Sequence, residues 1–148
     1  MDEHERYRSR TRASAELYGR AIRTMPGGVC HTIRFFEPYP IYVEEAEGPR
    51  IRDADGNEYV DFWMGHGALI LGHTPEPVIE GVRDQARRGC HWGTVNRLQV
   101  ELSELLINVL PSAEMVRFCN TGAEATTYAC RLARGYTKRR KIAKIEGG

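Results

Sequence analysis

The sequence predicts an α/β fold, and three segments near the C-terminal end of its 148 residues carry this prediction. Residues 115–119 form a short apolar and aromatic run, which is typical of a buried strand. Residues 123–134 follow with strong helix formers and apolar side chains at helical spacing. Residues 141–145 indicate a second core strand. Two parallel strands joined by one helix form a βαβ unit.

Helical spacing predicts three further helices in the chain. Residues 5–24 place apolar side chains on one side and charged ones elsewhere, and Pro26-Gly27-Gly28 ends this helix. Residues 75–88 form the next predicted helix, which Gly89 terminates. Residues 97–110 have leucines along one face, and Pro111 follows as the stop.

A small group of strands is expected between the first two helices. The candidate strands are residues 41–46, 50–53 and 58–61. Asp55-Gly56-Asn57 separates the last two, and this sequence is typical of a tight hairpin turn. Residues 29–40, with two prolines, are expected to be irregular but partly buried.

Composition and charge exclude several classes of protein. The net charge is +1 and 41% of the residues are hydrophobic, so no nucleic-acid or membrane partner is indicated. The charged start, Met1-Asp2-Glu3-His4-Glu5-Arg6, lacks the apolar core of a secretory signal. The four cysteines have no C-x-x-C spacing, which favours reduced thiols and a cytoplasmic location.

The turn between the strand at 115–119 and its helix is the leading candidate for a binding site. Thr121 is a favourable N-cap, and Glu124 three residues later completes a capping box. The backbone N–H groups of Gly122 and Ala123 then point away from the helix, where an anion such as phosphate can bind. From the residues alone, a purely structural helix start is the commoner interpretation.

The same turn resembles a family signature. Asn120-Thr121-Gly122-Ala123-Glu124-Ala125 is similar to the Asn-Ser-Gly-Thr/Ser-Glu-Ala motif of class III pyridoxal-phosphate (PLP) aminotransferases, and in particular of the glutamate-1-semialdehyde aminomutase group. Further matches occur in order along the chain: Pro26-Gly27-Gly28-Val29, Ala46-Glu47-Gly48, residues 53–61, Ile70-Leu71-Gly72-His73, Val109-Leu110-Pro111, residues 131–137 and Lys144-Ile145-Glu146-Gly147-Gly148.

The resemblance implies a fold-type I PLP-dependent transferase and a division of the chain into three parts. Residues 1–25 would be an N-terminal helix, 26–74 small-domain strands with an irregular substrate-side segment, and 75–148 the start of the large PLP-binding domain. The family's Schiff-base lysine and pyridinium carboxylate match no residue here and are expected beyond residue 148. The chain is therefore expected to be an N-terminal fragment that is inactive alone, and the full-length protein is expected to be a homodimer.

The resemblance also implies roles for individual residues. PLP phosphate would bind at Thr121, Gly122 and Ala123, although Ala123 lacks the family's hydroxyl. Arg34 falls where the aminomutase-like enzymes keep an arginine near the substrate carboxylate, and a guanidinium suits bidentate carboxylate binding. His66 lies in a substrate-side segment, Met64-Gly65-His66-Gly67, which departs from the aminomutase pattern.

Function is therefore expected to be amino-group transfer between an amino acid or amine and a keto acid or aldehyde. Glutamate-1-semialdehyde 2,1-aminomutase proper, in tetrapyrrole biosynthesis, is one alternative. A non-catalytic anion-binding or dimerisation module is another.

Two other motifs are excluded. Residues 67–74 nearly match a phosphate loop, but His73 stands in place of its lysine. The histidine spacing indicates no metal site.

Overall fold

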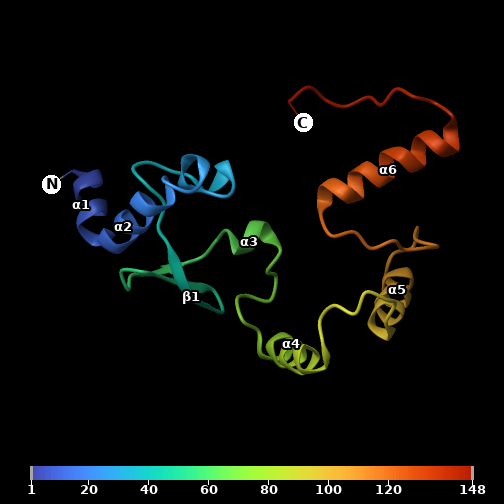
Figure 1. The fold of residues 1–148 in the computed structure, drawn as a ribbon, viewed down its shortest axis with the longest axis horizontal. Coiled ribbons are helices and arrows are strands. Elements are labelled where there is room, and N and C mark those ends of the chain that lie inside the picture. The colour runs from blue at the N-terminus through green and yellow to red at the C-terminus, as the bar shows by residue number, and fades with distance from the viewer. Residues whose placement is uncertain (1, 148) are drawn as a thin grey trace. The chain divides into compact units, whose positions relative to one another are not determined.

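The structure is a computed structural model that describes residues 2–147. The chain divides into two compact units, Met1–Cys90 and His91–Gly148 (Figure 1). Within residues 2–147 no helix is both long and apolar enough to cross a membrane.

The first unit begins with two helices where the sequence predicts one. They are α1 (Glu3–Arg10) and α2 (Arg12–Ala21), and the prediction of a single helix over 5–24 is wrong. Thr11 leaves the helical conformation at φ −130° and ψ 46°. Asp55 then caps α2 from outside, because its carboxylate accepts hydrogen bonds from the backbone N–H groups of Ala13 at 2.7 Å and Ser14 at 3.0 Å.

An irregular segment joins these helices to the sheet, as the sequence predicts. It contains only two short 3-10 helices, η1 (Pro26–Gly28) and η2 (Thr32–Arg34). Aromatic side chains of this segment pack on tyrosines of α1 and α2. The segment therefore owes its conformation mainly to side-chain packing rather than to backbone ladders.

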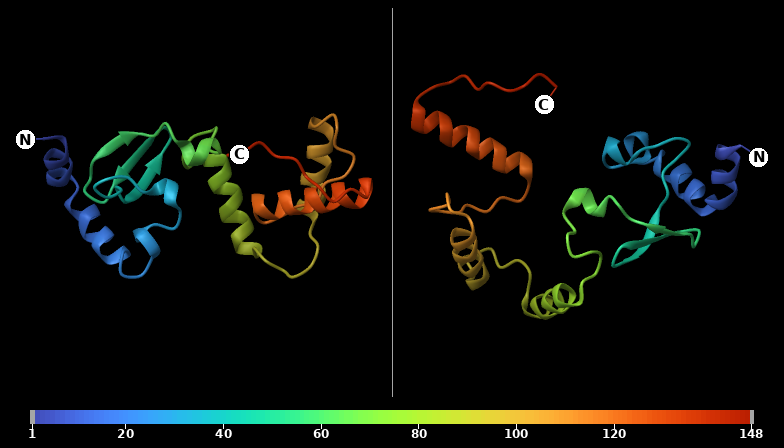
Figure 2. Two further views of the ribbon diagram at one scale, coloured as in Figure 1. Left: turned by 90° about the horizontal axis from the view of Figure 1, so that it is seen from above. Right: turned by 180° about the vertical axis from the view of Figure 1, so that it is seen from behind.

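Three strands form one antiparallel sheet in the order β1-β2-β3, which the left view of Figure 2 shows. They are β1 (Val43–Glu47), β2 (Arg50–Asp53) and β3 (Glu58–Val60), so all three strand predictions are confirmed within a few residues. Gly56 occupies the turn between β2 and β3 at φ +82°, which confirms the hairpin.

Asp53 ties this hairpin together. The residue is 2% exposed. Its carboxylate accepts hydrogen bonds from the backbone N–H groups of Asp55 and Asn57, from the Asn57 amide, and from the Tyr59 hydroxyl at 2.8 Å. Burial, followed by the hydrogen bond to Asp53, raises the pKa of Tyr59 to about 12. The tyrosine thus remains a neutral donor at physiological pH.

The first unit ends with α3 (Met64–Gly67) and α4 (Glu76–Arg88), and the second contains α5 (Arg97–Val109) and α6 (Gly122–Thr137). The last three match the predicted helices closely. Gly89 ends α4 at φ +104°, in the manner expected of a terminating glycine.

The two strands predicted on either side of α6 are not formed. In the described part of the second unit, neither residues 115–119 nor residues 141–145 are in a strand, so the predicted βαβ unit is wrong for this structure. A parallel strand is stable only when neighbouring strands accept and donate its backbone hydrogen bonds. Residues 91–147 provide no such neighbour.

We expect the 148-residue chain, expressed alone, to self-associate. None of residues 91–147 is buried, and large apolar side chains such as Leu105, Leu132 and Ile145 are 56%, 74% and 85% exposed. Exposed apolar patches of this kind promote association. Light scattering at several concentrations measures it, and a monodisperse monomer would contradict the expectation.

Candidate functional site

The N-terminus of α6 has the geometry that its sequence predicts. Thr121 is the N-cap at φ −139° and ψ 157°, and its hydroxyl oxygen accepts a hydrogen bond from the Glu124 N–H at 3.2 Å. The Glu124 carboxylate in turn accepts from the N–H groups of Asn120 at 2.8 Å and Thr121 at 3.2 Å. The capping box is confirmed, and these hydrogen bonds satisfy three backbone donors of the turn.

Two backbone donors remain at the start of this 16-residue helix. The N–H groups of Gly122 and Ala123 have no hydrogen-bond acceptor among residues 2–147. The space beside Gly122 is open, because a Cβ built there would meet no atom within 4 Å. The Thr121 hydroxyl also keeps its hydrogen available as a donor, since its oxygen is the acceptor for Glu124.

These three donors fit a phosphate group. They all lie at a helix start, where the dipole favours negative charge. Ala123 lacks the hydroxyl of the Thr or Ser that the family motif has at this position, so one side-chain donor is absent. The backbone N–H of Ala123 remains as a donor. We refer to Thr121, Gly122 and Ala123 as the phosphate cup.

Arg34 ends η2 in the first unit. Its backbone N–H donates to the His31 carbonyl at 2.9 Å, which closes the short helix. Its side chain is exposed, and no hydrogen bond or ion pair to another described residue holds the guanidinium. The group is therefore available to bind a carboxylate.

His66 lies in α3, at φ +64° and ψ 33°, between two glycines that also have positive φ. The residue is exposed, and its ring packs edge-on against Trp63 at 5.1 Å and 64°. Arg34 and His66 belong to the same unit, but within the described structure no hydrogen bond or ring contact joins them. The phosphate cup belongs to the second unit.

A hydrogen bond between the side chains of Asp61 and His73 joins the two ends of the segment that carries His66, and no sequence motif predicted this contact. Asp61 accepts hydrogen bonds from the backbone N–H groups of Trp63 and Met64, and its Oδ2 lies 2.8 Å from His73 Nε2. The hydrogen bond to His73 and those from the two N–H groups lower the pKa of Asp61. His73 also exchanges backbone hydrogen bonds with Gly48.

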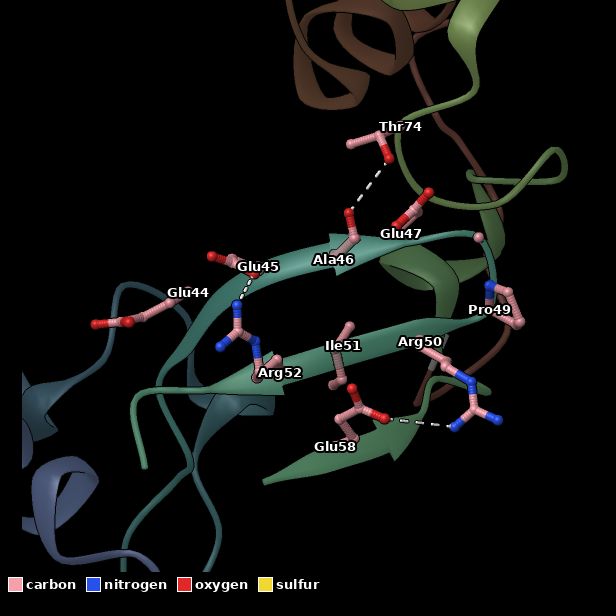
Figure 3. A pocket seen from close by; sticks show the side chains of 11 residues that line it. Glu44, Glu45, Ala46, Glu47, Pro49, Arg50, Ile51, Arg52, Glu58 and Thr74 are labelled. Carbon is pink, nitrogen blue, oxygen red and sulfur yellow. Dashed lines mark hydrogen bonds and ion pairs between the residues drawn. The ribbon is translucent and has the colours of Figure 1, made fainter. Parts of the chain in front are cut away.

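Two hollows in the described structure are lined by residues other than these candidates. One, of about 790 Å³, lies over β1 and β2 (Figure 3). Both arginines that line it are paired, Arg52 with Glu45 and Arg50 with Glu58. The other, of about 750 Å³, runs along α6, where the Arg117 guanidinium lies 4.7 Å from the centre of the Tyr128 ring. Among residues 2–147 no cluster of side chains could hold a metal ion.

Comparison with known proteins identifies the class of this fold. A transaminase structure solved with PLP bound matches 93% of this chain and 32% of its own, with a TM-score of 0.90 and 40% identity. An omega-transaminase from Sphaerobacter thermophilus matches 91% of this chain and 31% of its own, with a TM-score of 0.88 and 41% identity. The chain therefore has the fold of the corresponding part of a fold-type I PLP-dependent transferase, as predicted.

The family follows from the sequence matches. The model of the family described as "Aminotransferase class-III" matches residues 34–148. A glutamate-1-semialdehyde 2,1-aminomutase from Methanothrix thermoacetophila is 50% identical over 136 residues, which are 92% of this chain and 32% of that protein. The chain belongs to the class III aminotransferase family. It spans about a third of the length of the curated relatives that it matches.

Proposed function

We propose that the protein carrying this chain uses PLP to transfer an amino group between an amino acid or amine and a keto acid or aldehyde. The observation that carries the proposal is the phosphate cup, with two unpaired backbone donors and one hydroxyl at the start of α6. Bound PLP supplies an electron sink for bond changes at the amino-bearing carbon. The role of the phosphate cup is to bind the phosphate group of PLP and so to orient the cofactor.

The first unit contributes candidates for holding the substrate. The exposed Arg34 guanidinium can form two parallel hydrogen bonds with a carboxylate, which fixes both position and orientation. The exposed His66 ring can donate or accept a hydrogen bond at the substrate, while its contact with Trp63 limits its orientation. The proposed assembly is a cytoplasmic homodimer, supported by the family resemblance and by cysteines that lack disulfide spacing.

Glutamate-1-semialdehyde aminomutase is the second candidate, and the 50% identity to a protein of that name favours it. The departures from the aminomutase pattern around His66 favour a transaminase with another amino donor. The two differ in what they consume. A mutase converts its aldehyde substrate without a second partner, whereas a transaminase needs a separate amino acceptor for sustained turnover.

The test uses the full-length protein loaded with PLP. We expect an added amino donor to convert the bound PLP to pyridoxamine phosphate, which absorption spectra follow, and an added keto acid to reverse the change. Isomerisation of glutamate-1-semialdehyde alone would select the aminomutase. PLP binding without any amino transfer would contradict the proposal and leave the non-catalytic binding module.

The cup itself can be tested by replacing Gly122 with proline. Proline is favoured at the first helical position, and Thr121 already has the extended conformation required before it. The replacement thus removes one N–H donor and preserves the helix start. Loss of a hydrogen bond to a charged group, worth at least about 1.5 kcal/mol, predicts roughly tenfold weaker binding of PLP to the full-length protein.

Gly122→Ala is the matched control, because it keeps the N–H and its methyl group enters open space. Equilibrium titration with PLP measures both variants, and pyridoxal, which lacks the phosphate, should bind both equally. Equal PLP affinity for Gly122→Pro and Gly122→Ala would rule out the cup as the phosphate site.

A further inference from the structure

The segment that carries Arg34 has little backbone structure of its own. Between α2 and β1, only the three residues of η1 and the three of η2 are helical. The Arg34 side chain makes no hydrogen bond with any described residue. Its position must therefore be set by its neighbours in the chain and by the side chains that they contact.

Tyr18 of α2 contacts this segment on both sides of Arg34. Its ring centre lies 6.2 Å from that of Phe35, the residue directly after Arg34, and 6.3 Å from that of Tyr39 in a stacked arrangement. Before Arg34 in the sequence, Gly28 packs so closely that a Cβ there would lie 2.6 Å from Tyr18 Cε2. One aromatic ring thus touches three points of the segment.

The ring is itself held on a fixed support. Asp55 of the hairpin caps the start of α2. Tyr39, five residues after Arg34 in the sequence, is 6% exposed. Its hydroxyl lies 3.1 Å from the hydroxyl of Thr11 at the junction of α1 and α2. Phe36, two residues after Arg34, packs edge-on against Tyr7 of α1 at 6.3 Å.

We infer that Tyr18 is a positioning residue for Arg34, and that it presents the guanidinium to the substrate carboxylate by fixing Gly28 and Phe35. The inference rests on the proposed role of Arg34. The contacts all involve the ring, since the Tyr18 hydroxyl has no hydrogen-bond partner among the residues described. Without the ring, Arg34 stays in the protein but samples many orientations, and binding must first order it.

The test compares Tyr18→Leu, Tyr18→Phe and Arg34→Ala in the full-length, PLP-loaded protein. We expect Tyr18→Leu to raise KM for a carboxylate substrate about tenfold with a smaller change in kcat, and Tyr18→Phe to restore KM to within about twofold. Turnover of an amine without a carboxylate should change little. Adding Tyr18→Leu to Arg34→Ala should cause no further rise in KM, because residues that act through one group are not additive.

A second readout needs neither substrate nor cofactor. Trypsin cleaves after arginine, so the rate of cleavage after Arg34, located by mass spectrometry, reports how well this segment is held. We expect faster cleavage at this bond in Tyr18→Leu than in Tyr18→Phe. Gly28→Ala, which would crowd the ring from the other side at φ +70°, should produce the same rise in KM and in cleavage.

The outcomes separate the inference from the function on which it rests. If Arg34→Ala leaves carboxylate substrates unaffected, the role of Arg34 is wrong and the inference fails with it. If Arg34→Ala raises KM but Tyr18→Leu and Gly28→Ala do not, or if their effects add fully to it, the inference alone is wrong. Should Tyr18→Leu fail to fold, Gly28→Ala decides by both readouts.

Discussion

Replacing Asp53 with alanine is expected to lower the free energy of unfolding by about 3 kcal/mol, because it leaves several partly buried donors without an acceptor. These donors are the backbone N–H groups of Asp55 and Asn57 and the Tyr59 hydroxyl. The hairpin between β2 and β3 should open, and with it the turn from which Asp55 caps α2. Urea unfolding of the full-length protein, followed by circular dichroism, measures the change.

Asp53→Asn is the matched control for this effect, because an amide keeps the shape and one acceptor oxygen. It should cost less than half as much. If Asp53→Ala unfolds at the same urea concentration as the unsubstituted protein, the hydrogen bonds to this carboxylate do not hold the unit together.

The stabilising effect of Asp53 should also depend on pH. Burial by itself raises the pKa of this carboxyl, but the hydrogen bonds from Asn57, Tyr59 and the backbone together outweigh it and leave the pKa lowered. A lowered pKa in the folded state means that the contribution is complete above the unfolded value of about 3.9 and is lost as the pH falls further. The loss of stability on acidification should be shallower in Asp53→Asn, in urea titrations between pH 6 and pH 3.

Replacing Arg34 with alanine should lower kcat/KM for carboxylate substrates roughly ten- to hundred-fold, mainly through KM. The loss of a charge-assisted pair costs on the order of 1.5–3 kcal/mol, which corresponds to that range. Arg34→Lys should restore only part of the activity, because an ammonium group cannot form the two parallel hydrogen bonds of a guanidinium. Steady-state kinetics of the full-length protein measures both variants.

Two controls accompany the Arg34 variants. An amine substrate without a carboxylate should be nearly indifferent to the substitution, and PLP affinity should stay constant because the phosphate cup consists of other residues. A change within about twofold for carboxylate substrates, equivalent to roughly 0.4 kcal/mol, would mean that Arg34 is only an exposed surface residue.

Local sequence signals predicted the parts of the site that depend on near neighbours. The capping box at Thr121 and Glu124 is complete within three residues, so its hydrogen bonds follow from spacing alone. The hairpin at Asp55-Gly56-Asn57 is equally local, since Gly56 supplies the positive φ that the turn requires. The resemblance to class III aminotransferases added the candidate roles of Arg34 and His66, which remain predictions.

The wrong predictions of secondary structure arose where residues far apart in the sequence decide the local conformation. The break between α1 and α2 cannot be read from residues 5–24, because Asp55 and Tyr39, 28 or more positions away, provide the hydrogen bonds that favour it. The strands expected at 115–119 and 141–145 have the right composition, but a strand exists only when another segment pairs with it. The contacts of Tyr18 with Gly28 and Phe35 also join separate segments, so no local sequence pattern predicts them.

The sequence by itself therefore determined the helices α4, α5 and α6, the hairpin, the capped turn of the phosphate cup and the family of the chain. Each depends on interactions within a few residues or on a colinear series of motifs. Only the tertiary structure decided where the first helix breaks, which residues hold the Arg34 segment, and which apolar runs become strands. These features depend on packing and pairing between segments that are far apart in the chain, and a one-dimensional pattern does not contain those contacts.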